Sequence, residues 1–312
     1  MTVILEAERI RVHYDRLVAV GGVDLRLEAG QLMGLIGPNG AGKTSLFRAL
    51  CGLQPLAAGR VRVLGAELTP FNRGVMRAIG FAPDTPPVYE TLSVEQFLEG
   101  IGRAYGLPRN TIEERIDFWL DQLWLSEKRT AKVGALSRGM RQRLTIARTL
   151  LPDPAFILLD EPSAGLDPAG RVQFRQLLTS LREQGKALIV SSHILADLHE
   201  YCSHIGIIEA GRLRQFGTVA EVVLGHAADW TRYRLTLARP MPEIAVLLPE
   251  IEGARNVRVD GRVVLFEYAD DPDKAAALLA DLVRRGFPVA SFSALELNLE
   301  EAYLRAGIRQ VD

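Results

Sequence analysis

The sequence predicts an α/β fold built on a parallel sheet, and three observations predict it. A glycine-rich stretch, Gly37-Pro38-Asn39-Gly40-Ala41-Gly42-Lys43-Thr44, follows an apolar run at 32–36 and precedes a helical pattern. A second apolar run, 156–159, ends in two acidic residues, and a third, 187–192, ends at a histidine. Short apolar runs separated by helical patterns are typical of buried parallel strands joined by helices.

The composition is that of an ordinary globular protein. The 312 residues are 48% hydrophobic and 24% charged, which predicts about two domains. A net charge of -1 argues against a nucleic-acid partner. The two cysteines, Cys51 and Cys202, and the 5 histidines show no disulfide framework and no metal-ligand spacing. The sequence has no signal-peptide pattern and no run of about 18 apolar residues, so no membrane span is predicted.

Strands are predicted for most of the first 36 residues. The stretches 3–14 and 18–27 alternate between apolar and polar residues, and 28–30 indicates a turn. Tyr14 lies between the first two strands. Its ring could stack on an adenine base or pack within a sheet, and the strand pattern leaves both readings open.

The glycine-rich stretch matches the phosphate-binding pattern G-x-x-x-x-G-K-[ST]. Because glycines lack a β-carbon, the chain can curl there and direct several N–H groups at an anion, at the positive end of the following helix. Lys43 is then predicted to reach the β- and γ-phosphates, and the Thr44 hydroxyl suits Mg²⁺. A chance glycine-rich turn is disfavoured by the flanking strand and helix. The loop alone predicts a nucleotide phosphate and no particular reaction.

A helical insertion is predicted after this loop. Capping boxes at Ser93 and Thr111 open amphipathic helices that reach about residues 105 and 123. A further helix follows Ser137, and there Ser137 and Gly139 lie where free N–H groups favour an anion. A plain capped helix would have the same pattern. Further strands are expected at 61–65 and 79–83.

Two carboxylates end the run at 156–159. Asp160 is a candidate Mg²⁺ ligand, and Glu161 is a candidate general base for the water that attacks the γ-phosphate. The alternative is a structural ion pair, which the end of a buried strand beside a phosphate loop makes less favoured.

The chain beyond the acids continues the α/β pattern. Asp167 is predicted to cap a helix that has Pro168 at its first position and runs to about residue 183. His193, just past the third strand, is a candidate γ-phosphate contact, although a lone histidine is more often structural. Two more strands, at 205–209 and 213–216, and a helix ending near residue 224 complete this part.

Together these stretches resemble the ATP-binding cassette (ABC) family over about residues 3–224. Leu136-Ser137-Arg138-Gly139-Met140 is similar to the family signature, 163–167 to its D-loop, and His193 to its switch histidine. The resemblance implies a P-loop NTPase cassette with a mixed sheet and a helical insertion (about 85–150), in a domain spanning 1–225. It also implies ATP contacts at Tyr14, Gly37, Pro38, Asn39, Gly40, Ala41, Gly42, Lys43, Thr44, Ser45, Ser137, Gly139 and Asp167, catalytic roles for Lys43, Glu161 and His193, and Mg²⁺ ligation by Thr44, Asp160 and Asp84.

Three positions depart from the family pattern. Arg138 stands where the signature usually has a glycine, Met140 where it has a glutamine, and Asp84 where the family has a glutamine near Mg²⁺. A carboxylate is shorter than that glutamine side chain and charged. These departures resemble the exporter-like cassettes that work with separate membrane subunits of the ABC-2 type.

The resemblance implies an ATP hydrolase that powers a membrane transporter. Two copies would sandwich each ATP between one copy's phosphate loop and the other copy's Ser137 and Gly139, and ATP would close this dimer. The partner would be a separate multi-spanning permease, which holds the chain at the cytoplasmic face of the cell membrane. The stretch 86–90 is the expected permease contact.

The last quarter of the chain is predicted to be a separate α+β domain, 226–312. Its pattern is strand, helix, hairpin, helix and strand, the ferredoxin-like βαββαβ order, with a closing helix at 299–306. Helices are expected at 240–248 and 273–285. The domain carries no catalytic cluster, so an accessory role in dimerisation or regulation is expected, with ligand sensing as the alternative.

Two other functions remain as alternatives. A soluble ABC-type ATPase acting on nucleic acid or ribosomes usually has two cassettes, long coiled coils, zinc motifs or basic arms, and this sequence has one cassette and none of these. A P-loop kinase outside the family is disfavoured by the signature-like stretch.

Overall fold

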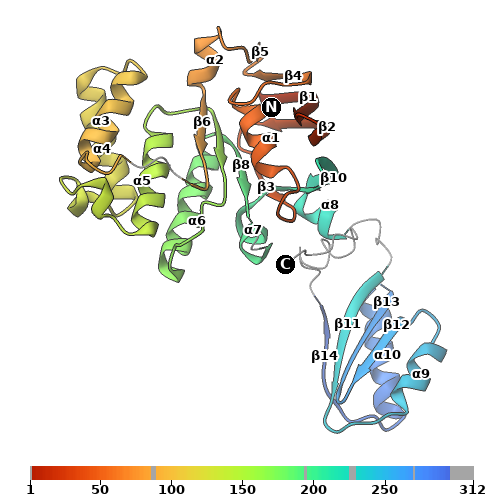
Figure 1. Ribbon diagram of the computed structural model, residues 1–312. Coiled ribbons are helices and arrows are strands. Elements are labelled where there is room, and N and C mark those ends of the chain that lie inside the picture. Colours follow the sequence, from red (N-terminus) through yellow and green to blue (C-terminus); the bar gives the residue numbers. More distant parts are fainter. Residues whose placement is uncertain (1, 86–88, 193–194, 225–229, 270, 296–312) are drawn as a thin grey trace. The chain divides into compact units, whose positions relative to one another are not determined.

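The computed structural model describes residues 2–85, 89–192, 195–224, 230–269 and 271–295. His193 and the helix predicted at 299–306 lie outside these residues, as do residues 86–88 of the expected permease contact. The chain divides into two compact units, and the second begins at Ala220. Figure 1 labels most of the elements of both units.

A six-stranded mixed sheet forms the centre of the first unit. Its strands, in spatial order, are β10 (Arg212–Thr218), β9 (His204–Glu209), β3 (Leu32–Ile36), β8 (Ala187–Ser191), β7 (Phe156–Leu159) and β6 (Ile79–Ala82). All neighbours are parallel except β10 and β9. Every residue of β3, β7 and β8 is buried, as the three apolar runs predict. Because these strands are parallel, the residues after them meet at one edge of the sheet.

A second, antiparallel sheet lies beside the first. It contains β2 (Leu17–Glu28), β1 (Val3–Tyr14), β4 (Ala58–Val63) and β5 (Ala66–Glu67). Helix α1 (Lys43–Leu50) buries Leu46, Phe47 and Leu50 in a core shared with residues of both sheets. This core fixes the start of α1, and therefore the glycine-rich loop, against both sheets.

The remaining helices of the first unit follow the predicted order closely. They are α2 (Arg73–Arg77), α3 (Val94–Ala104), α4 (Arg109–Gln122), α5 (Arg138–Leu150), α6 (Pro168–Glu183) and α7 (Leu195–Tyr201), with 3₁₀ turns at Ser126–Lys128 and Val133–Ala135. Helix α8 (Val219–Leu224) lies at the boundary, and its residues from Ala220 on belong to the second unit. The predicted starts of α5 after Ser137 and of α6 after Asp167 are confirmed. Helix α2, capped by Asn72, was not predicted because one turn is too short for a periodic pattern.

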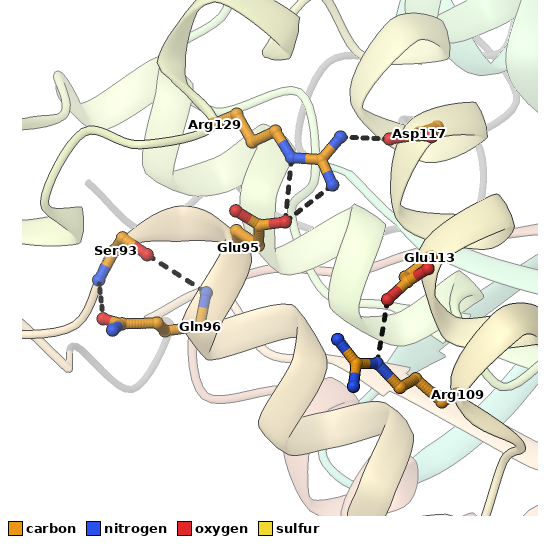
Figure 2. Close-up of polar contacts among 7 residues, drawn as sticks. All are labelled: Ser93, Glu95, Gln96, Arg109, Glu113, Asp117 and Arg129. Carbon is orange, nitrogen blue, oxygen red and sulfur yellow. Dashed lines mark hydrogen bonds and ion pairs between the residues drawn. The ribbon is translucent and has the colours of Figure 1, made fainter.

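The helical insertion has one correct and one wrong capping prediction. Figure 2 shows the capping box of α3, in which Ser93 accepts from the Gln96 N–H and Gln96 accepts from the Ser93 N–H. No capping box forms at Thr111, because α4 begins two residues earlier, after Pro108. Gly106, at φ 71, ends the preceding helix, and the proline ring holds an extended turn from which the new helix starts at once.

Ion pairs connect the helices of this insertion. The Arg129 guanidinium contacts Glu95 of α3 and Asp117 of α4 (Figure 2), and these carboxylates hold the pKa of Arg129 above its usual value. Arg109 and Glu113 pair across the first turn of α4 at 3.0 Å. Arg129 thus joins α3 to α4.

The second unit has the predicted βαββαβ order. Its elements are β11 (Trp230–Leu237), α9 (Ile244–Glu250), β12 (Arg255–Asp260), β13 (Val263–Ala269), α10 (Pro272–Arg284) and β14 (Val289–Ala294). The strands form an antiparallel sheet in the order β12-β13-β11-β14. Helix α9 starts four residues later than the predicted 240, because a residue before proline avoids helical dihedrals and Met241 precedes Pro242. Buried side chains of both helices and of β11 and β13 form one core, and partly buried residues of β12 and β14 pack against it.

Candidate nucleotide-binding site

The glycine-rich loop joins β3 to α1 and lies too close to its neighbours for side chains at two positions. A β-carbon at Gly37 would lie 2.3 Å from the Ile208 carbonyl oxygen, and one at Gly42 would lie 2.4 Å from the Ala19 carbonyl oxygen. Gly42 also has φ 101, in the left-handed region that favours glycine. The loop conformation therefore depends on these two glycines, which set the turn that begins α1.

This loop forms one wall of a cavity of about 600 Å³. The cavity brings together Tyr14, most of the loop and three acidic residues that are far apart in the sequence. Its lining residues are Tyr14, Leu17, Val18, Ala19, Pro38, Asn39, Gly40, Ala41, Gly42, Lys43, Thr44, Ser45, Asp84, Asp160, Glu161, Ala210 and Gly211. A cavity lined by a phosphate-type loop, carboxylates and an aromatic ring has the chemistry to hold a nucleotide with a cation.

Lys43 is held inside the loop. Its Nζ donates to the Gly37 carbonyl oxygen at 2.7 Å and to the Pro38 carbonyl oxygen at 3.3 Å. Burial lowers the pKa of Lys43, and the charges of Glu161 and Asp160 oppose this. The ammonium group therefore lacks full solvation, and an anion placed in the loop would restore its charge stabilisation.

Asp160 is fixed by hydroxyl groups from two other elements. Its Oδ2 accepts from the Thr44 hydroxyl of α1 at 2.7 Å, and its Oδ1 accepts from the Ser191 hydroxyl of β8 at 2.6 Å. The Ser191 oxygen also accepts from the Glu161 N–H at 2.9 Å. The sequence did not single out Ser191 as a site residue. Its signal was a serine ending an otherwise apolar strand, next to the strand that ends in the acids.

Glu161 and Asp84 complete the acidic side of the cavity. Glu161 adopts φ 48, an uncommon backbone conformation for a non-glycine residue, directly after β7. Asp84 follows β6, next to β7 in the sheet. The hydroxyl and carboxylate oxygens here are hard donors of the kind that Mg²⁺ prefers. Within the described residues, no three His, Cys, Asp or Glu side chains form a metal cluster of their own. The oxygens therefore suit a cation that arrives with phosphate ligands.

Tyr14 ends β1 at the rim of the cavity, and its side chain is 38% exposed. The half-exposed ring leaves a face available to a planar ligand. Gly211, in the turn between β9 and β10, also lines the cavity and was not predicted to belong to it. Its N–H donates to the Ala41 carbonyl at 2.9 Å, and its carbonyl accepts from the Gly21 N–H at 2.8 Å. The sequence indicated a turn here, but not its contact with the loop.

Three predicted site residues lie away from the cavity. Ser137 caps α5 by accepting from the Met140 N–H at 3.3 Å, and Gly139 is in the first turn of the same helix. Asp167 caps α6 by accepting from the Gly170 N–H at 2.9 Å. The three residues stand together at the starts of α5 and α6, since a β-carbon at Gly139 would lie 2.8 Å from the Gly165 carbonyl.

Comparisons with known proteins agree with this geometry. Residues 20–164 match the family model described as "ABC transporter". The chain is 36% identical to the Nod factor export ATP-binding protein I of Cupriavidus pinatubonensis, covering 100% of this chain and 93% of that protein. It is 28% identical to the linearmycin resistance ATP-binding protein LnrL of Bacillus subtilis, covering 96% and 97%. A solved ATP-binding subunit of an ABC transporter is similar with a TM-score of 0.68, at 28% identity, over 72% of this chain and 93% of that one.

The fold, the cavity and the relatives agree. In the part of the chain that the structure describes, no helix is long and apolar enough to cross a membrane. The mixed sheet, the glycine-rich loop and the two acids at the end of β7 are the P-loop ATPase arrangement that the sequence predicts. The chain belongs to the ABC transporter family, in which it is an ATP-binding subunit and an ATP hydrolase.

Proposed function

We propose that this chain binds Mg²⁺ with ATP, hydrolyses ATP between two copies of itself, and drives export through a separate membrane permease. The observation that carries the proposal is the cavity that joins the phosphate loop, the pair Thr44 and Asp160, and Glu161. Each of these groups matches one part of phosphoryl-transfer chemistry, in which positioning and charge stabilisation account for most of the catalysis.

The nucleotide would lie along the loop. Backbone N–H groups of the loop and the start of α1 would bind the phosphates, Lys43 would neutralise their charge, and the Tyr14 ring would stack on the base. Mg²⁺ would be held by Thr44 and Asp160, with Asp84 as a further ligand. When bound, it neutralises phosphate charge. Glu161 would orient and deprotonate the attacking water, and His193, which lies outside the described residues, would contact the γ-phosphate.

A second copy would complete each site. Ser137, Gly139 and Asp167 do not line the cavity of their own chain, yet the start of α5 has the N–H groups that suit an anion. A two-fold arrangement places these residues against the nucleotide of the partner, and both sites form together. ATP would stabilise the closed dimer because it contacts both copies only there.

The membrane partner would dock at a smaller pocket on the helical insertion. This pocket, of about 300 Å³, is lined by residues of α2, β6, α3 and α5 and by residues that follow α1 and α3, including Leu53 and Tyr105. Arg148 lies in it and donates to the Phe81 carbonyl at 3.0 Å. Burial lowers the pKa of Arg148. No described carboxylate lies within ion-pair distance of Arg148, so an acidic side chain on an inserted permease segment would stabilise it. Tyr105 and the exposed Tyr89, which is in the stretch 86–90, lie near Arg148 and oppose this lowering of its pKa.

The direction of transport is proposed from the relatives. Several are named for Nod factor export and one for linearmycin resistance, and the chain matches them over nearly their whole length. The permease would keep the chain at the cytoplasmic face of the membrane. We further propose that residues 226–312 are an accessory domain and that 1–225 hold the ATPase. No observation favours the nucleic-acid alternative, in line with the net charge of -1.

The purified chain tests this proposal directly. ATP hydrolysis that requires Mg²⁺ and whose specific rate rises with protein concentration is expected, because two copies form each site. Light scattering should show a dimer when ATP is added to the Glu161→Gln variant. A specific rate independent of concentration, with a monomer at every ATP level, would contradict the shared site.

A further inference from the structure

The first half of α5 contacts the loop before α6 at three points. The Gly139 and Gly165 backbones approach too closely for a side chain at Gly139, as described above. The Arg138 side chain lies against Gly165, its Cδ 3.5 Å from the position of a β-carbon there. One turn further along α5, Arg143 reaches Asp167, with Nη2 at 3.5 Å from Oδ1. The start of α5 and the loop 163–167 therefore form one contact surface.

Arg143 also contacts the segment that follows α4, within the helical insertion. Its guanidinium lies over the Trp124 ring, with the guanidinium carbon 5.7 Å from the ring centroid. Trp124 follows the end of α4 and adopts φ 52, a conformation in which helix ends usually carry glycine. Its side chain is 46% exposed, so burial of the ring does not explain a bulky residue at this strained position. The contact with Arg143 explains why a tryptophan is found there.

The approach of Arg143 to Asp167 depends on a glycine. A β-carbon at Gly170 would lie 2.8 Å from the Arg143 Nη2, so a larger residue would displace the guanidinium. The Asp167 oxygen that faces Arg143 is the one that caps α6. One cation is thus shared by the aromatic ring of the insertion and by the carboxylate that begins α6.

From this geometry we propose that Arg143 is a positioning residue that links the end of α4, in the helical insertion, to the loop 163–167. It sets how the start of α5, with Ser137 and Gly139, is presented to the nucleotide of a second copy. The inference rests on the proposed function and names the connection through which the insertion acts on the shared site. Arg143, Trp124 and Asp167 are outside the cavity of their own chain, so ATP capture by the chain's own loop does not depend on them.

The first test separates kcat from KM in steady-state ATP hydrolysis. Arg143→Met and Trp124→Leu are each expected to lower kcat by roughly fivefold, the effect of losing one cation–π contact or one exposed ion pair, with KM for ATP nearly unchanged. Arg143→Lys keeps the charge near Asp167 and should recover part of kcat. Arg255→Met removes a comparable contact over Trp230 in the second unit, at 3.9 Å, and should leave both constants unchanged. Wild-type kcat in Arg143→Met would overturn the inference.

The second test needs no ATP. In thermal unfolding, the double variant Trp124→Leu/Arg143→Met should lose less stability than the two single variants lose in sum. The double variant Arg143→Met/Asp167→Asn should behave in the same way. Additive losses in both cycles would show that the three side chains do not interact and would overturn the inference. Failure of the proposed function looks different: the wild-type chain itself would leave ATP intact, while the cycles would still report on this contact.

Discussion

The Thr44 hydroxyl donates to the Asp160 carboxylate at 2.7 Å, and this bond joins the first turn of α1 to the end of β7. The two residues are 116 positions apart in the sequence. Asp160 is buried although Thr44 is exposed, and Ser191 fixes the other oxygen of Asp160. The carboxylate is therefore oriented before any cation arrives, and the cost of ordering it on Mg²⁺ binding is small.

Asp160→Asn keeps the shape of this side chain and removes its charge. Because Mg²⁺ prefers charged oxygen ligands, the variant should need more Mg²⁺ and its kcat should fall by about 10²-fold or more. The rate measured as a function of Mg²⁺ at saturating ATP checks this. Ser191→Ala is the matched variant: it removes only the orienting bond and should have a smaller effect. Equal Mg²⁺ dependence in wild type and Asp160→Asn would exclude Asp160 as a ligand.

Much of this site was predictable from the sequence because its parts are local patterns. The glycine-rich loop, the acids after an apolar run and the Asp167-Pro168 helix start each occupy a few consecutive residues, and the structure places the elements as expected. Ser191 was missed because its role depends on β8 pairing with β7, which no local pattern records. The false capping box at Thr111 matched the motif, but Gly106 and Pro108 decided where the helix starts.

The contacts between the insertion and the rest of the first unit were beyond local patterns. Trp124 resembles an ordinary apolar residue of α4 in the sequence, and only its φ of 52 and its position over Arg143 set it apart. Likewise, Arg148 fits the polar side of α5 by spacing, yet it lies in a pocket lined by residues of α2, β6 and α3 and of the segment after α1. Such placements depend on tertiary packing, which composition and periodicity do not specify.

Lys43 should take up protons when ATP binds. Its pKa is lowered from 10.5 by burial, so between the lowered value and 10.5 the unfolded chain holds more protons than the folded chain. The contribution of Lys43 to folding stability therefore rises with pH across that window and is unfavourable below it. Bound phosphates would raise the pKa again. Calorimetry in two buffers of different ionisation enthalpy, at a pH within the window, should detect the uptake.

The Lys43→Met variant is the control for this measurement. It keeps an unbranched side chain, one atom shorter and without the charge, so the proton uptake should vanish and ATP affinity should fall by about 10²-fold. The same uptake in Lys43→Met and wild type would assign the protons to another group.

Tyr14→Ala should raise KM for ATP by roughly fivefold to tenfold and change kcat little, because a stacked base contributes to binding and not to the reacting phosphates. Tyr14→Phe keeps the ring and should behave as wild type. A comparison of ATP with GTP sharpens the test, since loss of stacking should reduce any preference between the bases. Unchanged KM in Tyr14→Ala would return the ring to a purely structural role in β1.

Glu161→Gln should bind ATP with near wild-type affinity and hydrolyse it at least about 10²-fold more slowly, because the amide cannot accept the proton of the attacking water. Gln has the same size, and the Glu161 N–H bond to Ser191 is a backbone bond that the substitution leaves in place. Binding measured with a fluorescent ATP analogue and turnover measured by phosphate release check the two halves separately. Rapid turnover in Glu161→Gln would remove this residue as the base.

Arg148→Met should stabilise the isolated chain while weakening its attachment to a permease. Replacing a partly desolvated cation by a shorter, unbranched apolar side chain removes a burial cost, so the unfolding midpoint is expected to rise or stay level. The same change removes the charge that an acidic permease residue would pair with, and loss of such a pair weakens binding by about 10²-fold or more.

Arg115→Met is the matched control, since Arg115 also donates to a main-chain carbonyl, that of Leu151, from the helical insertion. Co-purification with the permease, quantified beside ATPase activity of the free chain, separates the two effects. If Arg148→Met both unfolds more easily and still binds the permease as wild type does, the guanidinium is a structural anchor for β6 and the docking site lies elsewhere on the insertion.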